Sequence, residues 1–215
     1  MDLYGLLGYP LGHSFSAAYF TEKFSNLQID ARYCNFEYNS VEAALAYMMQ
    51  QDELKGFNVT IPYKEKIIPY LSELSADAAA IGAVNVVKVI RDGNGKVSLK
   101  GYNSDYIGFV DSIKPLLHTD CHRSALVLGT GGASRAIVYG LRSLNLQVQL
   151  VSRRGGDNVL TYDDLNEPLL STFGVIVNCT PLGMYPHCDD APPIPYKGLT
   201  PVSYTHLTLP TICSV

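Results

Sequence analysis

Short apolar runs alternate with amphipathic stretches along most of the chain. The apolar runs have the length of strands and cover residues 3–7, 31–36, 56–61, 83–90, 96–100, 124–128, 147–151 and 173–178. Apolar residues at helical spacing predict helices that begin at Ser14 and Ser40, with both serines as N-caps, and Pro62 is well placed as the first residue of another helix. A further helical pattern covers residues 103–117. Another begins after the glycines near residue 131 and ends at residue 144.

The order of these elements predicts the fold class. Residues 92–95 read Asp-Gly-Asn-Gly, which favours a tight hairpin between two strands. A second unit begins near Arg123, where a strand, a glycine-rich turn, a helix and a strand form one βαβ unit. Alternating strands and helices predict an α/β fold of two units with largely parallel sheets. Ligands of such sheets bind beyond the carboxyl ends of the strands, where the polar motifs of this chain also fall.

Composition narrows the class of protein. The chain has 215 residues, of which 47% are hydrophobic and 17% are charged, and its formal net charge is −4 with no basic tract. This balance argues against a general nucleic-acid binder, which needs a face rich in Lys and Arg. No apolar run approaches the roughly 20 residues that span a bilayer, and the N-terminus has no basic and apolar regions of a secretory signal. Five cysteines without C-x-x-C spacing predict reduced thiols in a cytoplasmic protein.

The glycine-rich turn has the pattern of a phosphate-binding loop. Gly129, Gly131 and Gly132 follow a buried strand and precede a helix, whose first N–H groups can bind a pyrophosphate. Ser134 stands where the usual fingerprint has its third glycine, which permits a slightly looser helix contact. The context predicts dinucleotide binding. The alternative is a structural turn that carries glycine for steric reasons only.

The residues after the next strand indicate which dinucleotide. Sites for NAD usually carry Asp or Glu at this place, which accepts a hydrogen bond from the ribose 2′-hydroxyl. Here the chain has Ser152, Arg153 and Arg154, with two cations and no carboxylate. Guanidinium groups bind phosphate in bidentate fashion, so the pattern favours the 2′-phosphate of NADP(H). A solvated basic turn is the alternative.

Other polar residues near strand ends are candidates for chemistry. A lysine close to a carboxylate can move a proton to or from a carbonyl or hydroxyl, and Lys64 with Asp105 could form such a pair, although spacing alone leaves open whether they meet. Ser14 and Ser16 could hold a carboxylate or a polyol, or could simply lie at a helix start. Asn85 lies in an apolar run, so its amide needs partners from a ligand or from the backbone. We predict no metal site: the only candidates, in the connector at residues 118–122, have no second cluster of ligands.

Together these residues resemble the shikimate dehydrogenase family, whose members reduce 3-dehydroshikimate to shikimate with NADPH. The resemblance extends from about residue 4 to residue 201 and rests on residues 12–16, 58–64, 82–85, 103–105, 129–135 and 178–184. It implies a substrate-binding domain over residues 1–103, a Rossmann-like NADP-binding domain over residues 104–201, and a place in aromatic amino acid biosynthesis. The small-molecule substrate would be shikimate or 3-dehydroshikimate, and the protein would be a monomer or a homodimer.

The resemblance also implies roles for single residues. The catalytic pair of the family falls on Lys64 and Asp105, with Lys64 as the better candidate proton donor. The substrate-binding positions fall on Ser14, Ser16, Thr60 and Asn85. The NADP-binding positions fall on Gly129, Thr130, Gly131, Gly132, Ala133, Ser152, Arg153, Arg154, Thr180 and Met184. Two positions depart from the family: Ser104 replaces the usual threonine and keeps its hydroxyl, and Ser152 replaces the common asparagine.

The chain departs from the family after residue 201. Residues 202–215 contain no Asp, Glu, Lys or Arg and show no helical periodicity. The family continues with another strand, a glutamine that contacts substrate, and further helices, and the sequence predicts none of these after residue 201. We therefore expect residues 202–215 to be an aberrant tail from a truncated or misread end, and this polypeptide to be weakly active or inactive. Two alternatives stay open: a quinate/shikimate dehydrogenase that uses NAD or NADP, and a non-catalytic metabolite-binding protein.

Overall fold

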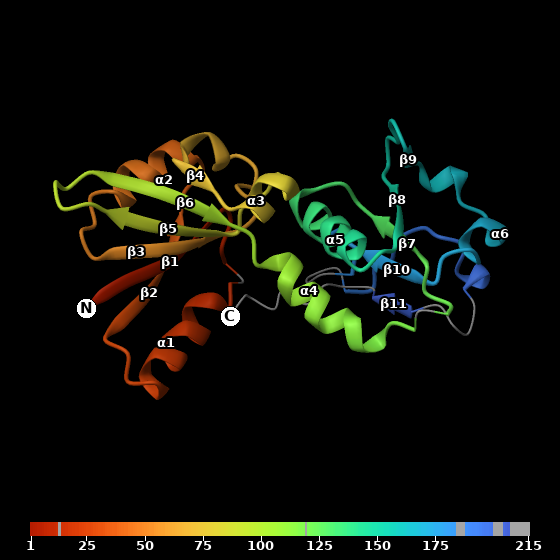
Figure 1. Ribbon diagram of the computed structural model, residues 1–215, viewed down its shortest axis with the longest axis horizontal. Coiled ribbons are helices and arrows are strands. Elements are labelled where there is room, and N and C mark those ends of the chain that lie inside the picture. The colour runs from red at the N-terminus through yellow and green to blue at the C-terminus, as the bar shows by residue number, and fades with distance from the viewer. Residues whose placement is uncertain (13, 119, 184–187, 200–203, 207–215) are drawn as a thin grey trace. The chain divides into compact units, whose positions relative to one another are not determined.

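The chain folds into two compact units, each with its own sheet. The computed structural model describes residues 1–12, 14–118, 120–183, 188–199 and 204–206. The first unit covers Met1–Ser104 and the second covers Asp105–Val215. Each unit is α/β, as the alternation of strands and helices predicts (Figure 1).

The first unit contains a six-stranded sheet in the order β2-β1-β3-β5-β6-β4. Strands β1 and β3 pair in parallel, as do β1 and β2 and β4 and β6, whereas β5 is antiparallel to both of its neighbours. The hairpin predicted at residues 92–95 joins β5 to β6 and makes the sheet mixed. The strands are β1 (Asp2–Gly8), β2 (Ala31–Glu37), β3 (Leu54–Val59), β4 (Glu73–Leu74), β5 (Val86–Arg91) and β6 (Val97–Tyr102).

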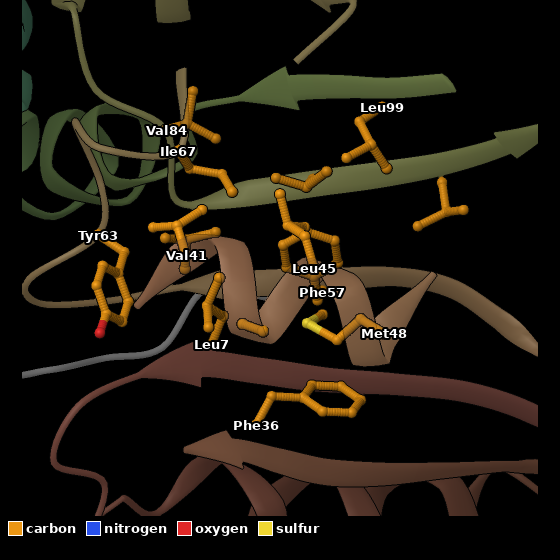
Figure 2. Packing of buried hydrophobic residues seen from close by; sticks show 14 of the residues in the cluster. Leu7, Phe36, Val41, Leu45, Met48, Phe57, Tyr63, Ile67, Val84 and Leu99 are labelled. Carbon is orange, nitrogen blue, oxygen red and sulfur yellow. The ribbon is translucent and has the colours of Figure 1, made fainter. Parts of the chain in front are cut away.

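Helices cover both faces of this sheet. Along β1, Leu3 and Leu7 belong to the core under α2 (Val41–Met48), and Leu6 belongs to the cluster under α1 (Ser16–Asn26), because side chains of a strand alternate between faces. Figure 2 shows the first of these cores, where side chains of α2 pack with strand residues. The unit also contains α3 (Ala76–Ile81) and a 3-10 turn, η1 (Ile68–Tyr70).

Two of the three helix starts predicted for this unit are wrong. Ser40 does cap α2, since its Oγ accepts a hydrogen bond from the N–H of Ala43 (3.1 Å). Ser14 is not an N-cap: its own N–H donates to the carbonyl of Leu11 in a preceding turn, and α1 begins two residues later. No helix begins at Pro62 either, because the N–H of Tyr63 donates to the carbonyl of Thr60 and closes a turn there.

The second unit contains a parallel sheet in the order β11-β10-β7-β8-β9. Helices α4 (Asp105–Ile113) and α5 (Gly132–Ser143) pack on one apolar cluster, and α6 (Glu167–Leu170) contributes to a second. The described residues of the unit also form three 3-10 turns: η2 (Lys114–Leu116), η3 (Tyr162–Asp164) and η4 (Tyr196–Gly198). The strands are β7 (Ser124–Leu128), β8 (Gln147–Val151), β9 (Val159–Leu160), β10 (Val175–Asn178) and β11 (Tyr204–His206). None of the helices within the described ranges is both long and apolar enough to cross a membrane.

Strand β11 corrects one expectation about the tail. The sequence predicted no further strand after residue 201, yet Tyr204–His206 pairs in parallel with β10. Strand β10 would otherwise be an edge of the sheet, and its backbone groups there can pair with any extended segment. Residues 202–203 and 207–215 lie outside the described residues.

Tyr63 offers a test of this packing. Its ring lies in the core of the first unit (Figure 2), and its hydroxyl donates to the carbonyl of Tyr38 (2.6 Å). Burial raises the pKa of Tyr63 above its usual value of 10.0. At a pH well below 10 the phenol of Tyr63 is neutral in both the folded and the unfolded chain. As the pH rises through 10, Tyr63 loses its proton in the unfolded chain before it does so in the folded chain. The free energy of unfolding therefore falls as the pH rises.

We therefore expect Tyr63→Phe to lower the free energy of unfolding by about 1 kcal/mol at pH 8, because one hydrogen bond is lost. The variant should also lose less stability than the parent between pH 8 and about 10.5, because the ionising group is gone. Urea unfolding at both pH values measures this. Tyr47→Phe, at an exposed position of α2, is the control, and equal behaviour of the two variants would contradict the prediction.

Candidate active site

The carboxyl ends of β1 and β3 carry polar motifs of the first unit. They lie side by side, with the N–H of Thr60 donating to the carbonyl of Leu7 (2.9 Å) and the N–H of Tyr9 donating to the carbonyl of Ile61 (3.2 Å). The two strand ends lie so close together that a Cβ on Gly8 would be 2.4 Å from Cγ2 of Thr60. The structure thus places Thr60 against the end of β1, from which the chain leads to the two serines.

The two serines lie at the start of α1. The N–H of Ser16 donates to Oγ of Ser14 at 3.3 Å, so one hydroxyl is used to orient the first helical residue. Ser16 is buried and Ser14 is half-buried. The N–H of Ser14 donates to the carbonyl of Leu11 (2.9 Å), and Cδ2 of Leu11 lies within 2.6 Å of the position that a Cβ on Gly8 would take. These contacts bring the serine loop to the same end of the sheet as Thr60.

Lys64 is tied to the segment that carries Asn85. The carbonyl of Lys64 accepts a hydrogen bond from the N–H of Val84 at 2.7 Å. The carbonyl of Asn85 accepts one from the N–H of Val59, the last residue of β3, at 2.8 Å. The half-buried Lys64 and the buried Asn85 therefore belong to adjoining segments at the carboxyl end of β3.

The side chain of Asn85 finds partners inside the protein. Its Oδ1 accepts from the N–H of Ser104 (2.8 Å), and its Nδ2 donates to Oγ of Ser104 (3.0 Å). The neighbouring buried Asn103 donates from Nδ2 to the carbonyl of Ala83 (3.0 Å). The segment just before Asp105 is thereby fixed to the strand end, and Asp105 itself is the half-buried first residue of α4 in the second unit. The pairing of Lys64 with Asp105 stays a prediction.

Sequence reasoning missed two residues that support this end of the first unit. Asn58 accepts at Oδ1 a hydrogen bond from the hydroxyl of Tyr33 (2.8 Å). Its Nδ2 donates to the carbonyl of Asn85 at 3.4 Å. An asparagine inside an apolar strand was visible in the sequence, but the tyrosine that reaches it comes from a strand 25 residues earlier. No pattern along one strand could identify that partner.

In the second unit, three parallel strands end together around the glycine-rich turn. The N–H of Gly129 donates to the carbonyl of Val151 (2.8 Å), and the N–H of Cys179 donates to the carbonyl of Leu128 (2.8 Å). Gly129 has φ +108°, and a Cβ there would lie 3.2 Å from the carbonyl oxygen of Cys179. Glycine at this position is required by the fold itself.

The start of α5 follows this turn. Gly131 occupies the N-cap position in an extended conformation, and a Cβ there would meet nothing within 4 Å. Ser134 is buried, and its hydroxyl donates to the carbonyl of Gly131 (2.7 Å), so the replacement of the third glycine adds a hydrogen bond to the turn. Thr130 is exposed and Ala133 is half-buried. The first N–H groups of a helix preceded by such a turn can bind an anion.

The basic residues after β8 are open to solvent. Arg153 and Arg154 are exposed, and neither forms a salt bridge with a carboxylate among the residues that the structure describes. Ser152 is half-buried, and its N–H donates to the carbonyl of Leu160 (2.9 Å). Burial raises the pKa of Tyr162, and the positive charge of Arg153 opposes that rise, which indicates that the guanidinium lies near this ring. The geometry leaves both guanidinium groups available for an anionic ligand.

The turn after β10 is organised by the buried Asn178. Its Oδ1 accepts from both the N–H (2.9 Å) and the hydroxyl (2.6 Å) of Thr180, and its Nδ2 donates to the carbonyl of Leu182 (3.0 Å). A cavity of about 230 Å³ lies beside this turn and is lined also by Gly183 and residues 188–192. Burial raises the pKa of the Cys179 thiol to about 12, so it stays protonated. Met184 lies outside the described residues.

No group of three or more His, Cys, Asp or Glu side chains that could hold a metal ion occurs in the described part of the chain. In the connector between the η2 turn and β7, Nδ1 of His122 accepts a hydrogen bond from the N–H of His118 (2.8 Å). That ring nitrogen is therefore engaged within the protein.

Comparison with known proteins identifies the family. A family model described as the shikimate dehydrogenase substrate binding domain matches residues 6–87. The chain is 35% identical to the shikimate dehydrogenase (NADP(+)) of Methanococcus maripaludis, over 92% of this chain and 74% of that protein. It is 38% identical to the shikimate dehydrogenase (NADP(+)) of Aquifex aeolicus, over 85% of this chain and 69% of that protein.

Solved structures agree. The crystal structure of shikimate dehydrogenase from Aquifex aeolicus matches with a TM-score of 0.81 and 32% identity, over 95% of this chain and 77% of that one. The crystal structure of the Thermus thermophilus enzyme in complex with NADP(H) and shikimate matches with a TM-score of 0.74 and 27% identity, over 92% and 75%. The resemblance inferred from the sequence motifs is confirmed: the chain belongs to the shikimate dehydrogenase family.

Proposed function

We propose that this protein reduces 3-dehydroshikimate to shikimate with NADPH, in the reversible reaction of aromatic amino acid biosynthesis. The observation that carries the proposal is the gathering of Thr60, Lys64 and Asn85 at one end of the first sheet, in a domain that matches the family's substrate-binding model. Ser14 and Ser16 at the same end would bind the substrate carboxylate, as the family pattern implies. Curated relatives named for the NADP(+)-dependent activity support the reaction class.

The second unit fits an NADP cofactor. The fold needs no glycine at Gly131, because its φ of −79° suits other residues and a Cβ would meet only open space. A pyrophosphate lying on the first N–H groups of α5 would need that space. Arg153 and Arg154 present two exposed cations where the adenosine 2′-phosphate would bind. We assign Thr130, Gly132, Ala133, Ser152, Thr180 and Met184 to the same site on the family pattern.

Lys64 and Asp105 would direct the proton. When bound, the cofactor would supply a hydride to the carbonyl carbon of the substrate. The alkoxide that develops on the carbonyl oxygen needs a proton, and the ammonium group of Lys64 is the proposed donor. The carboxylate of Asp105 would accept hydrogen bonds from the same region of substrate and orient it. Asn85, held by Ser104, would bind a ring hydroxyl of the substrate, as the family pattern implies.

The first test is Lys64→Ala. Removal of a general acid should lower kcat by at least about 100-fold while the KM for shikimate changes much less, because the carboxylate and hydroxyl contacts remain. Oxidation of shikimate, followed by the appearance of NADPH, measures both constants. Lys66→Ala is the matched control, since Lys66 is exposed and two residues away.

Three outcomes separate the functional alternatives. Unchanged turnover in Lys64→Ala would remove this lysine from the chemistry. No turnover by the parent chain, together with no change in its Tm on adding shikimate, would contradict the proposed function. Stabilisation by shikimate without turnover would indicate a chain that binds the metabolite without catalysis, either because residues 202–215 are an aberrant tail or because the protein is a non-catalytic metabolite-binding protein.

A second prediction separates a ligand requirement from a folding requirement in the glycine turn. Gly131→Ser should leave Tm unchanged or slightly raised, because serine is a good N-cap and has room, yet it should weaken NADP binding roughly tenfold or more. Gly129→Ser should lower Tm, since φ +108° is strained for any side chain. Thermal unfolding and NADP titration measure both effects. Normal NADP affinity in Gly131→Ser would argue for a purely structural turn.

The third prediction concerns the choice of dinucleotide. Arg153→Ala should raise the KM for NADP by about 10- to 100-fold and leave the KM for NAD unchanged, because one charge-assisted contact to the 2′-phosphate is lost. Arg123→Ala is the control, since this exposed arginine precedes β7 at the opposite end of the strand. A parent chain that prefers NAD, or that oxidises quinate as well as shikimate, would instead indicate a quinate/shikimate dehydrogenase.

A further inference from the structure

We propose that Tyr33 is a positioning residue for the substrate site of the first unit. Its ring packs against α1, the helix that begins with Ser16, and its hydroxyl fixes the position of the segment that contains Asn85 through Asn58. The inference deepens the proposed function and rests on it. Tyr33 lies on β2, is only 7% exposed, and faces the cluster formed with Leu6 and Leu11. It is therefore buried beneath the site.

The ring of Tyr33 packs on α1. It stacks on Phe20 with ring centroids 4.6 Å apart and an interplanar angle of 14°. Phe20 lies four residues, or about one helical turn, after Ser16, so both belong to the same side of the helix. The stacked pair fixes how the first turn of α1 sits on the sheet, and with it the buried Ser16.

The hydroxyl of Tyr33 reaches across a strand. Strand β1 lies between β2 and β3, and in register Tyr33 stands opposite Tyr4 while Asn58 stands opposite Leu6. The hydroxyl donates to Oδ1 of Asn58 at 2.8 Å. This bond orients the amide so that its Nδ2 points to the carbonyl of Asn85 at 3.4 Å. The carbonyl of Asn85 thus receives the Asn58 amide as well as the N–H of Val59.

The hydrogen bond between Tyr33 and Asn58 indicates that the hydroxyl of Tyr33 has a role beyond packing. A tyrosine hydroxyl among apolar side chains is costly unless it is hydrogen-bonded, and packing alone would be satisfied by phenylalanine. With phenylalanine at position 33, Oδ1 of Asn58 would lose this donor and its amide could turn away from Asn85. The hydroxyl is therefore a constraint on where Asn85 stands relative to Ser16, and it should act on substrate affinity more than on turnover.

The test compares Tyr33→Phe with Tyr4→Phe. Tyr4 belongs to the same cluster, and its ring lies 5.7 Å from that of Phe24, so both variants remove one hydroxyl from one packing environment. We expect Tyr33→Phe to raise the KM for shikimate by about 5- to 10-fold, with kcat and the KM for NADP within about twofold of the parent. Tyr4→Phe should leave all three constants unchanged. Calorimetric titration with shikimate should show the same weakening without relying on turnover.

A double-variant cycle makes the mechanism explicit. If Tyr33 acts through Asn58, Tyr33→Phe combined with Asn58→Ala should bind shikimate no more weakly than Asn58→Ala alone. Equal shikimate constants for Tyr33→Phe and Tyr4→Phe, or fully additive effects in the cycle, would overturn the positioning role while the proposed function stands. A parent chain that neither binds nor oxidises shikimate would instead overturn the proposed function and this inference with it.

Discussion

Amide side chains buried at strand ends must find hydrogen-bond partners, and this constraint shapes both halves of the molecule. Leaving such a group unpaired costs about 1–3 kcal/mol, so each amide selects one local arrangement of the chain. Asn85 takes Ser104 as its partner, Asn103 takes the carbonyl of Ala83, and Asn178 takes Thr180 and Leu182. In each case the bond fixes a loop that follows a strand, which is where ligands of α/β sheets bind.

In the first unit these bonds link segments that are far apart in sequence. The carbonyl of Lys64 is held by Val84, the carbonyl of Asn85 by Val59, and the amide of Asn58 by Tyr33. A substrate recognised through a carboxylate and several hydroxyls needs its contacts at fixed distances, since small displacements of positioning groups are costly for catalysis. The hydrogen-bonded strand ends supply that rigidity through backbone and amide groups.

The second unit uses glycine for two different reasons. Gly129 is needed because the backbone has a positive φ and lies against the carbonyl of Cys179. Gly131 faces open space at the first turn of α5, so the fold itself does not require glycine at this position. Ser134 shows that the third position of the fingerprint tolerates a side chain when its hydroxyl can bond to the turn itself. The sequence motif alone does not distinguish a glycine that the backbone requires from one that it does not, whereas the backbone geometry does.

Alternation of apolar and polar residues along the chain was enough to predict the α/β class, most strands, the hairpin at residues 92–95 and the cap at Ser40, because these depend on side chains a few residues apart. The combination of motifs was also enough to identify the family. Tertiary structure alone decided that Ser14 lies in a turn before α1, that no helix begins at Pro62 and that Tyr204–His206 joins the second sheet. It alone brought Tyr33 to Asn58, because a hydrogen bond across an intervening strand depends on sheet order and register, which no local pattern encodes.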